Sequence, residues 1–98
     1  MYTIKPLEEF TAWLGDIKDS NVRIRLARRL DKAAHGLLGD VEPVGEGVSE
    51  MREHFGAGWR MYYVIRGNDI VVMLGGGNKS RQSKDIKMAK QRAKQLEE

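Results

Sequence analysis

Residues 48–77 read VSEMREHFGAGWRMYYVIRGNDIVVMLGGG and contain three strand patterns separated by two short turns. From Val48 onward the apolar period changes from 3.6 to two, which is typical of strands in a sheet. The Gly67-Asn68 pair favours a two-residue hairpin, because both turn positions need a positive φ. We therefore predict a mostly antiparallel arrangement of three strands: Val48–Phe55, Trp59–Arg66 and Asp69–Leu74.

The residues before this stretch predict a short strand and two helices. Residues 2–5 are a strand candidate that ends at Pro6. Apolar residues then recur every three or four positions in 7–17 and again in 24–37, which places one apolar stripe on each of two helices. These two segments predict an antiparallel helical hairpin. The segment 39–47, GDVEPVGEG, is rich in turn-forming residues and predicts a loop.

The residues after the third strand pattern predict a turn and a final helix. Gly75-Gly76-Gly77 is expected to end the last strand, and the lysine-rich segment Ser80–Glu98 predicts a helix with a thin apolar stripe. The order β-α-α-β-β-β-α is typical of α+β folds. We therefore predict an N-terminal strand and a helical hairpin packed on a small, mostly antiparallel sheet with a C-terminal helix, all helices lying on one face. The length of 98 residues predicts a single domain over 1–98.

The composition excludes several classes of protein. The chain has no cysteine, so it has neither a disulfide scaffold nor a thiolate metal cage. Its two histidines are too few for a metal site unless carboxylates complete it, and we expect no metal and no cofactor. No apolar run approaches the roughly 18 residues of a membrane span, and the N-terminus lacks a signal-peptide layout. We expect a cytoplasmic protein with no membrane partner.

The net charge of +3 is distributed unevenly along the chain. Residues 1–50 carry 7 Lys and Arg against 9 Asp and Glu, whereas residues 51–98 carry 10 against 5. The basic excess therefore lies in the second half of the chain, where we expect an anionic partner to bind.

The predicted hairpin register gathers polar residues on one face of the sheet. A three-residue loop at 56–58 places His54 opposite Arg60 and Arg52 opposite Tyr62. The second hairpin then brings a glycine, Gly75, beside the arginine of the middle strand, which leaves this face open. The residues predicted on this face are Glu50, Arg52, His54, Arg60 and Tyr62. The residues predicted on the opposite, core face are Met51, Phe55, Trp59, Met61 and Tyr63.

These residue types suit the cleavage of an RNA phosphodiester. Glu50 or His54 can take the proton of a 2′-hydroxyl group, and two arginines can bind phosphate oxygens with their forked donors. His54 or Lys79 can protonate the departing 5′-oxygen, while Tyr62 offers a ring for base stacking and Arg81 a further RNA contact. The catalytic candidates are Glu50, Arg52, His54, Arg60 and Lys79.

Two other interpretations fit the same pattern of residues. The same face without catalytic turnover would be a nucleic-acid binding surface. A solvated antiparallel sheet with cross-strand ion pairs also has this composition and needs no ligand.

Several short motifs, taken in order, resemble one known family. They are Glu50-Met51-Arg52, Gly58-Trp59-Arg60 followed by Tyr63, the apolar run 70–74, and Lys79 before a helix that contains Asp85-Ile86. This order resembles the RelE/ParE toxin superfamily, and within it the HigB-like addiction module killer branch. The resemblance covers nearly the whole chain.

The resemblance implies the toxin of a type II toxin–antitoxin pair, inhibited by a cognate antitoxin that is often a small helix-turn-helix protein. Members on the RelE side cleave mRNA, typically on the ribosome, with basic residues in catalytic roles. For this chain we expect a metal-independent endoribonuclease. The resemblance places Arg52 and Arg60 at the scissile phosphate, Lys79 at a basic position after the last strand, and Glu50 at a strand acid. A ParE-like inhibitor of DNA gyrase, or a non-catalytic module that binds RNA or a partner, are alternatives on the same fold.

Overall fold

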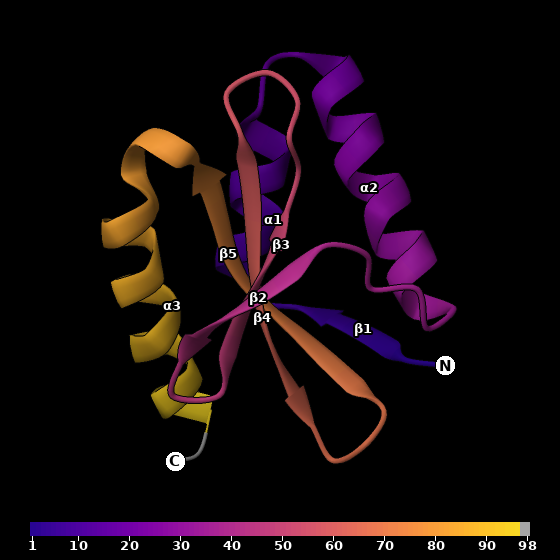
Figure 1. The fold of residues 1–98 in the computed structure, drawn as a ribbon, viewed down its shortest axis with the longest axis vertical. Helices are drawn as coiled ribbons and strands as arrows, with labels where there is room; N and C mark the ends of the chain where they lie inside the picture. The colour runs from indigo at the N-terminus through magenta and orange to yellow at the C-terminus, as the bar shows by residue number, and fades with distance from the viewer. Residues whose placement is uncertain (97–98) are drawn as a thin grey trace.

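The computed structural model describes residues 1–96, in which five strands form one sheet with helices beside it (Figure 1). The strands are β1 (Thr3–Pro6), β2 (Val41–Gly45), β3 (Val48–Arg52), β4 (Trp59–Arg66) and β5 (Ile70–Asn78). The helices are α1 (Glu8–Asp16), α2 (Ser20–Ala34) and α3 (Gln82–Leu96), and a short 3-10 helix, Lys79–Arg81, precedes α3. The strand order is β1-β5-β4-β3-β2, with β1 parallel to β5 and the other neighbours antiparallel.

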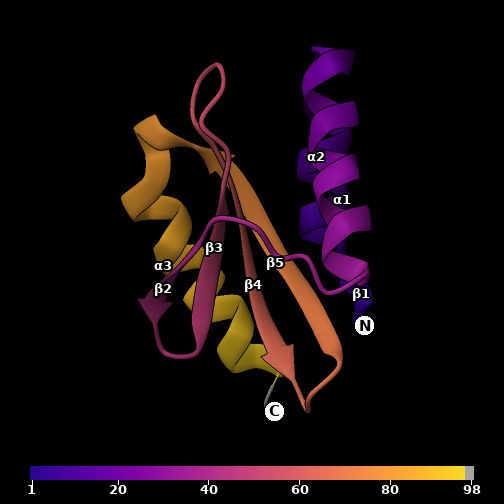
Figure 2. The same cartoon turned by 45° about the vertical axis from the view of Figure 1, so that its right-hand side comes forward.

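The α+β class, the helical hairpin and the mostly antiparallel sheet are confirmed, but the helices cover both faces of the sheet. Helices α1 and α2 pack on one face, where Phe10 and Leu26 meet Met61. Helix α3 packs on the other face, where Ala89 and Ala93 meet the buried side chains of β4 and β5 (Figure 2). The prediction that all helices lie on one face is therefore wrong.

The sequence of β4, WRMYYVIR, explains why both faces need a cover. Met61 and Tyr63 point toward α1 and α2, whereas Tyr62 and Val64 point toward α3, and all four side chains are buried. A strand that carries large apolar side chains at both parities is typical of a sheet buried on both sides. The alternation in β3, taken alone, indicates a sheet with one buried face. The continuous apolar run in β4 shows that both faces of the sheet are buried.

The register between β3 and β4 differs from the prediction by two residues. Arg52 lies opposite Arg60 and Glu50 opposite Tyr62, because β3 ends at Arg52 and a longer loop follows. A shift of two residues leaves each side chain on its predicted face, since strand side chains alternate with a period of two. The expected sharing of one face by these four residues is confirmed. His54 instead lies in the loop after β3, outside the strand.

The segment Val41–Gly45, predicted as part of a loop, forms the edge strand β2. Its Pro43 lacks an N–H donor, which an edge strand tolerates because one side of the strand faces solvent. The pairing of β2 with β3 shifts between Pro43 and Gly45, where the strand is irregular. The turn-forming residues of this segment therefore led to the wrong prediction of a loop, because the strand is stabilised by its pairing with β3 and not by local sequence.

Strand β5 continues through the three glycines to Asn78 instead of ending at Leu74. Two differences of one residue each bring Gly77, rather than the predicted Gly75, opposite Arg60. Arg66 pairs with Ile70 instead of Asp69, and the register shifts once more between Tyr62 and Tyr63. The glycines allow neighbouring helices to approach the strand. A Cβ atom on Gly76 would lie 2.4 Å from the Trp13 ring of α1, and one on Gly77 would lie 1.9 Å from Asp85 Oδ2 of α3.

The final helix begins later than predicted, at Gln82, because the 3-10 helix occupies Lys79–Arg81. The last two residues of the predicted segment, Glu97 and Glu98, lie outside the described residues. Among the helices of residues 1–96, none is long and apolar enough to span a membrane.

The contact between Gly76 and Trp13 predicts a large cost for the substitution Gly76→Ala. The added methyl group would displace the indole ring, and overpacking of this kind lowers the free energy of unfolding by about 1–3 kcal/mol. Gly15→Ala is the matched control, because a Cβ atom at this position of α1 meets nothing within 4 Å. Urea denaturation should show Gly76→Ala as clearly destabilised and Gly15→Ala as unchanged or more stable. Equal stability of the two variants would contradict the packing described here.

Candidate functional site

The polar face predicted from the sequence is covered by the start of α3 and is largely buried. Glu50 is 3% exposed and Arg60 is 7% exposed, and Arg60 Nε lies 3.5 Å from Glu50 Oε2. Gln82, the first residue of α3, donates from its Nε2 atom to both oxygens of Glu50, at 2.9 and 3.0 Å. Glu50 and Arg60 therefore form a buried ion pair, and Gln82 of α3 covers it and donates hydrogen bonds to Glu50.

Tyr62 lies on the same face and is fully buried. Burial raises the pKa of the Tyr62 hydroxyl well above its ordinary value, and the negative charges of Glu50 and Asp85 raise it further. The hydroxyl has no hydrogen-bond partner among the described residues. The prediction that the Tyr62 ring stacks on RNA bases is corrected accordingly, because no face of the ring reaches the surface.

Lys79 lies beside Arg60 at the end of the sheet, and Gly58 separates them. The Lys79 backbone N–H donates to the carbonyl of Ala57 at 3.3 Å, which ties the loop after β3 to the start of the 3-10 helix. A Cβ atom on Gly58 would lie 3.2 Å from Lys79 Cβ and 3.8 Å from Arg60 Nη1. Gly58 has a φ of +75°, so glycine suits both the turn and the space that these two cations occupy.

Arg52 is the third cation at this end of the sheet and lies opposite Arg60 in the β3–β4 register. Its Nη2 atom is 2.9 Å from Asp40 Oδ1 and 3.8 Å from Glu42 Oε2. The Arg52 side chain is 31% exposed, so its guanidinium remains within reach of a ligand. We call Arg52, Arg60 and Lys79 the cation cluster.

His54 lies in the loop after β3 and is paired with Asp40, with 2.6 Å between His54 Nε2 and Asp40 Oδ2. The hydrogen bond from Arg52 and then the one from His54 lower the pKa of Asp40 to about 2. Asp40 is therefore ionised at neutral pH and accepts from Nε2. This arrangement leaves Nδ1 as the ring nitrogen of His54 that can take a proton.

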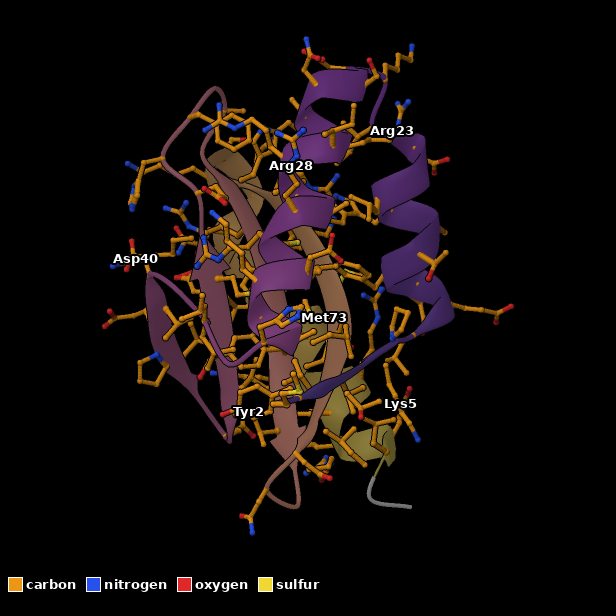
Figure 3. All side chains as sticks on the ribbon, turned by 90° about the vertical axis from the view of Figure 1, so that its right-hand side faces the viewer. Tyr2, Lys5, Arg23, Arg28, Asp40 and Met73 are labelled. Carbon is orange, nitrogen blue, oxygen red and sulfur yellow. The ribbon has the colours of Figure 1, made fainter. Side chains whose placement is uncertain are left out.

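Helix α2 supports this region from the side. The guanidinium of Arg29 donates to the carbonyls of Leu38, Asp40 and Arg52 at 3.0, 2.8 and 2.9 Å, and it pairs with Glu53 at 3.2 Å. Arg29 thus joins the end of β3 to the turn before β2. Figure 3 labels Arg28 on α2 and Asp40 at the edge of the sheet.

The outer surface of α2 carries further cations. Arg25 lies over the ring of Phe55, with its guanidinium carbon 3.6 Å from the ring centroid. Arg25, Arg28 and Lys32 are exposed. This basic row is continuous with the loop that contains His54.

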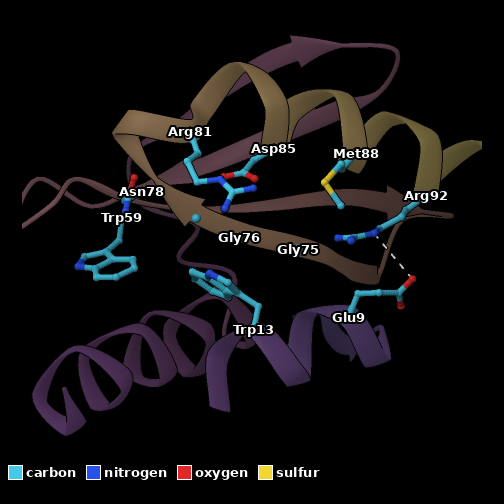
Figure 4. A pocket seen from close by; sticks show the side chains of 11 residues that line it. Glu9, Trp13, Trp59, Gly75, Gly76, Asn78, Arg81, Asp85, Met88 and Arg92 are labelled. Carbon is cyan, nitrogen blue, oxygen red and sulfur yellow. Dashed lines mark ion pairs between the residues drawn. The ribbon is translucent and has the colours of Figure 1, made fainter. Parts of the chain in front are cut away.

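Arg81, predicted as an RNA contact, lies in the same 3-10 helix as Lys79, and the two residues line one hollow at the start of α3. Arg81 is exposed and also lines a cleft between α1 and α3 (Figure 4). The structure thus brings Arg52, Arg60, Lys79 and Glu50 to one end of the sheet, with His54 in the adjoining loop.

Two residues that organise the site were absent from the sequence-based prediction, namely Asp40 and Gln82. Asp40 lies 14 positions before His54 in a segment predicted as a loop, and Gln82 lies 32 positions after Glu50. In the sequence, the one feature that pointed to Asp40 was its carboxylate directly after Gly39, in a turn-forming segment. In residues 1–96, no group of three His, Asp or Glu side chains is placed to hold a metal ion.

Comparison with known proteins identifies a related family. Residues 13–96 match the family described as phage derived protein Gp49-like (DUF891). An uncharacterized protein of Haemophilus influenzae is 36% identical over 93 residues, which cover 95% of this chain and 94% of that protein. No solved structure gives a significant match.

The Asp40 carboxyl should titrate near pH 2 in the folded protein, well below its ordinary value of 3.8. Ionised Asp40 therefore stabilises the fold above about pH 4, and this contribution is lost as the pH falls toward 2. Arg52→Ala should raise the pKa of Asp40 more than His54→Ala does, because Arg52 is the larger cause. NMR titration of the Asp40 carboxyl carbon measures both effects, and the reverse order would contradict the described pairing.

Proposed function

Because this chain belongs to the Gp49-like family of phage-derived proteins, a RelE-like family related to toxin–antitoxin systems, we propose that it is a toxin that cleaves mRNA. The family implies an antitoxin as a partner. We propose that the toxin cleaves RNA on the ribosome and needs no metal ion for the reaction. We also propose that residues 1–98 form a single domain and that the protein acts in the cytoplasm.

The observation that carries this proposal is the convergence of Arg52, Arg60 and Lys79 at one end of the sheet. Arg52 and Arg60 lie opposite each other on neighbouring strands, and Lys79 lies against Gly58 beside Arg60. Arg52 and the exposed Lys79 can contact a phosphate directly. Arg60, which is 7% exposed, contributes its positive charge from beneath as negative charge grows on the phosphate oxygens during cleavage.

The proposed reaction begins at the 2′-hydroxyl of the nucleotide before the scissile phosphate. His54 Nδ1 takes the hydroxyl proton, and the 2′-oxygen attacks phosphorus while the cation cluster stabilises the charge. The bond from phosphorus to the 5′-oxygen breaks, and Lys79 gives that oxygen a proton. The products are a 2′,3′-cyclic phosphate and a free 5′-hydroxyl.

Glu50, predicted as a possible general base, does not act as the base in the proposed reaction. Its two oxygens accept from Gln82, and it is 3% exposed, so a 2′-hydroxyl cannot reach it in this arrangement. We assign Glu50 as the residue that positions Arg60. Asp40 has the corresponding role for His54, because its carboxylate orients the imidazole ring.

The charge distribution also supports the proposed partners. The exposed cations of α2 line a hollow together with Glu53, the residue after Arg52, so they lie near the cation cluster and can bind ribosomal or messenger RNA phosphates. An antitoxin that neutralises this surface would present acidic side chains, since complementary charges accelerate and orient association.

Lys79→Ala should lower mRNA cleavage at least 100-fold, because it removes a cation and the proposed proton donor. Lys87→Ala is the matched control, since it removes the same charge from an exposed position of α3 outside the cation cluster. Cleavage is measured by primer extension after induction in cells, and with purified protein on mRNA with and without ribosomes. Arg60→Ala is a poorer test, because leaving Glu50 buried without its partner costs about 3–5 kcal/mol.

Three outcomes would overturn the proposal. Intact mRNA together with growth arrest and DNA breaks would identify a gyrase inhibitor. RNA binding without cleavage or arrest would identify a non-catalytic module. Equal cleavage by Lys79→Ala and Lys87→Ala would exclude Lys79 from the reaction.

A further inference from the structure

A cleft of about 340 Å³ lies between α1 and α3, next to the proposed catalytic site (Figure 4). Its floor is the glycine segment of β5, Gly75–Gly77, and Trp13 and Trp59 contribute to its walls. We call it the glycine cleft. Its volume lies at the lower end of the range for small-molecule sites, which suits a ligand about the size of one nucleoside.

The floor of the glycine cleft is an open strand edge. Strand β1 pairs with β5 only over Ile70–Met73, so among the described strands Gly75–Asn78 has β4 as its one neighbour. The carbonyl of Leu74, just before the glycines, accepts from Arg92 Nη1 at 2.8 Å. Arg92 Nε is also 3.7 Å from Glu9 Oε2, and this ion pair spans one end of the cleft.

Two aromatic side chains line the cleft. The Trp13 ring lies directly on Gly76, and its centroid is 6.3 Å from the centroid of the Trp59 ring, with the two planes at 57°. Both indoles are partly exposed, and the exposed Arg81 reaches the same space from the 3-10 helix. Indole and guanidinium faces are the surfaces on which unpaired nucleobases stack.

The glycine cleft meets the cation cluster where β5 ends and the 3-10 helix begins. Trp59 precedes Arg60, Asn78 precedes Lys79, and Trp59 lies opposite Asn78 in the register. Arg60 points to the opposite face of β4 from Trp59 and is buried, so the connection runs through the exposed Lys79. A phosphate held by Lys79 would place an adjoining nucleotide at the mouth of the cleft.

From this juxtaposition we propose that the glycine cleft binds a nucleobase of the RNA substrate by stacking on the tryptophans. The inference rests on the proposed function and adds a base-binding site to it. An extended peptide pairing with the open strand edge is the competing occupant. The Arg92–Glu9 ion pair and the use of the Leu74 carbonyl argue against it, because both obstruct a strand that continues past Gly75.

The chain has two tryptophans, and both line the glycine cleft, so intrinsic fluorescence reports on its occupancy. Adenosine is the probe, because it carries a base and no phosphate. We expect adenosine to quench the fluorescence saturably in the wild-type protein, and Lys79→Ala to retain this quenching. An absence of saturable quenching, or its loss in Lys79→Ala, would overturn the inference.

A matched pair of variants on α3 tests the location. Met88 lines the cleft and is 36% exposed, so Met88→Glu places a charge there without opening the core. Gln91→Glu adds the same charge at an exposed position of α3 outside the cleft. We expect Met88→Glu to weaken adenosine binding about tenfold or more and Gln91→Glu to leave it unchanged. Equal affinities of the two variants would overturn the inference, as would quenching by an acidic peptide but not by adenosine.

The adenosine measurement is independent of catalysis. If the protein binds adenosine in the cleft but leaves mRNA intact, the proposed cleavage fails while the base-binding site stands. If it cleaves mRNA but shows no adenosine binding, the inference fails while the proposed function stands.

Discussion

The ion pair between Glu50 and Arg60 is the constraint on which the arrangement of the site depends. Both side chains point under α3, where an unpaired charge would be costly, so each requires the other. Gln82 completes the pair from α3 and thereby couples the position of that helix to the middle of the sheet. The 3-10 helix that leads into α3 begins at Lys79, so the ion pair also helps to locate the exposed lysine beside the buried arginine.

The glycines of β5 form the second structural requirement. They let the Trp13 ring of α1 and the Asp85 carboxylate of α3 rest directly on the strand from opposite faces. A strand with side chains at these positions would push both helices away. The consequence is a narrow region in which two helices, an open strand edge and the cation cluster lie close together, although they come from distant parts of the chain.

The fold brings cations that are far apart in the sequence close together in space. A net charge of +3 is modest, yet Arg52, Arg60 and Lys79 come to one end of the sheet, and the exposed Arg25 and Arg28 add positive charge on α2. Carboxylates accompany several of these cations in specific roles. Asp40 orients Arg52 and His54, and Glu53 pairs with Arg29 behind the loop. Ion pairs therefore hold most of the charged residues of the site in place, while Lys79 remains exposed.

The period of two along β3 and β4 was sufficient to predict which of Glu50, Arg52, Arg60 and Tyr62 share a face, because a register error of two residues preserves alternation. The helical hairpin and the α+β class also followed from local periodicity. Which face is exposed did not follow, because α3 reaches the sheet only through its apolar stripe, and this contact buries Tyr62 and Glu50. The pairings of Asp40 with His54 and of Gln82 with Glu50 likewise depended on the tertiary fold. Such contacts join residues that no local pattern relates, so only the folded chain brings them within hydrogen-bond distance.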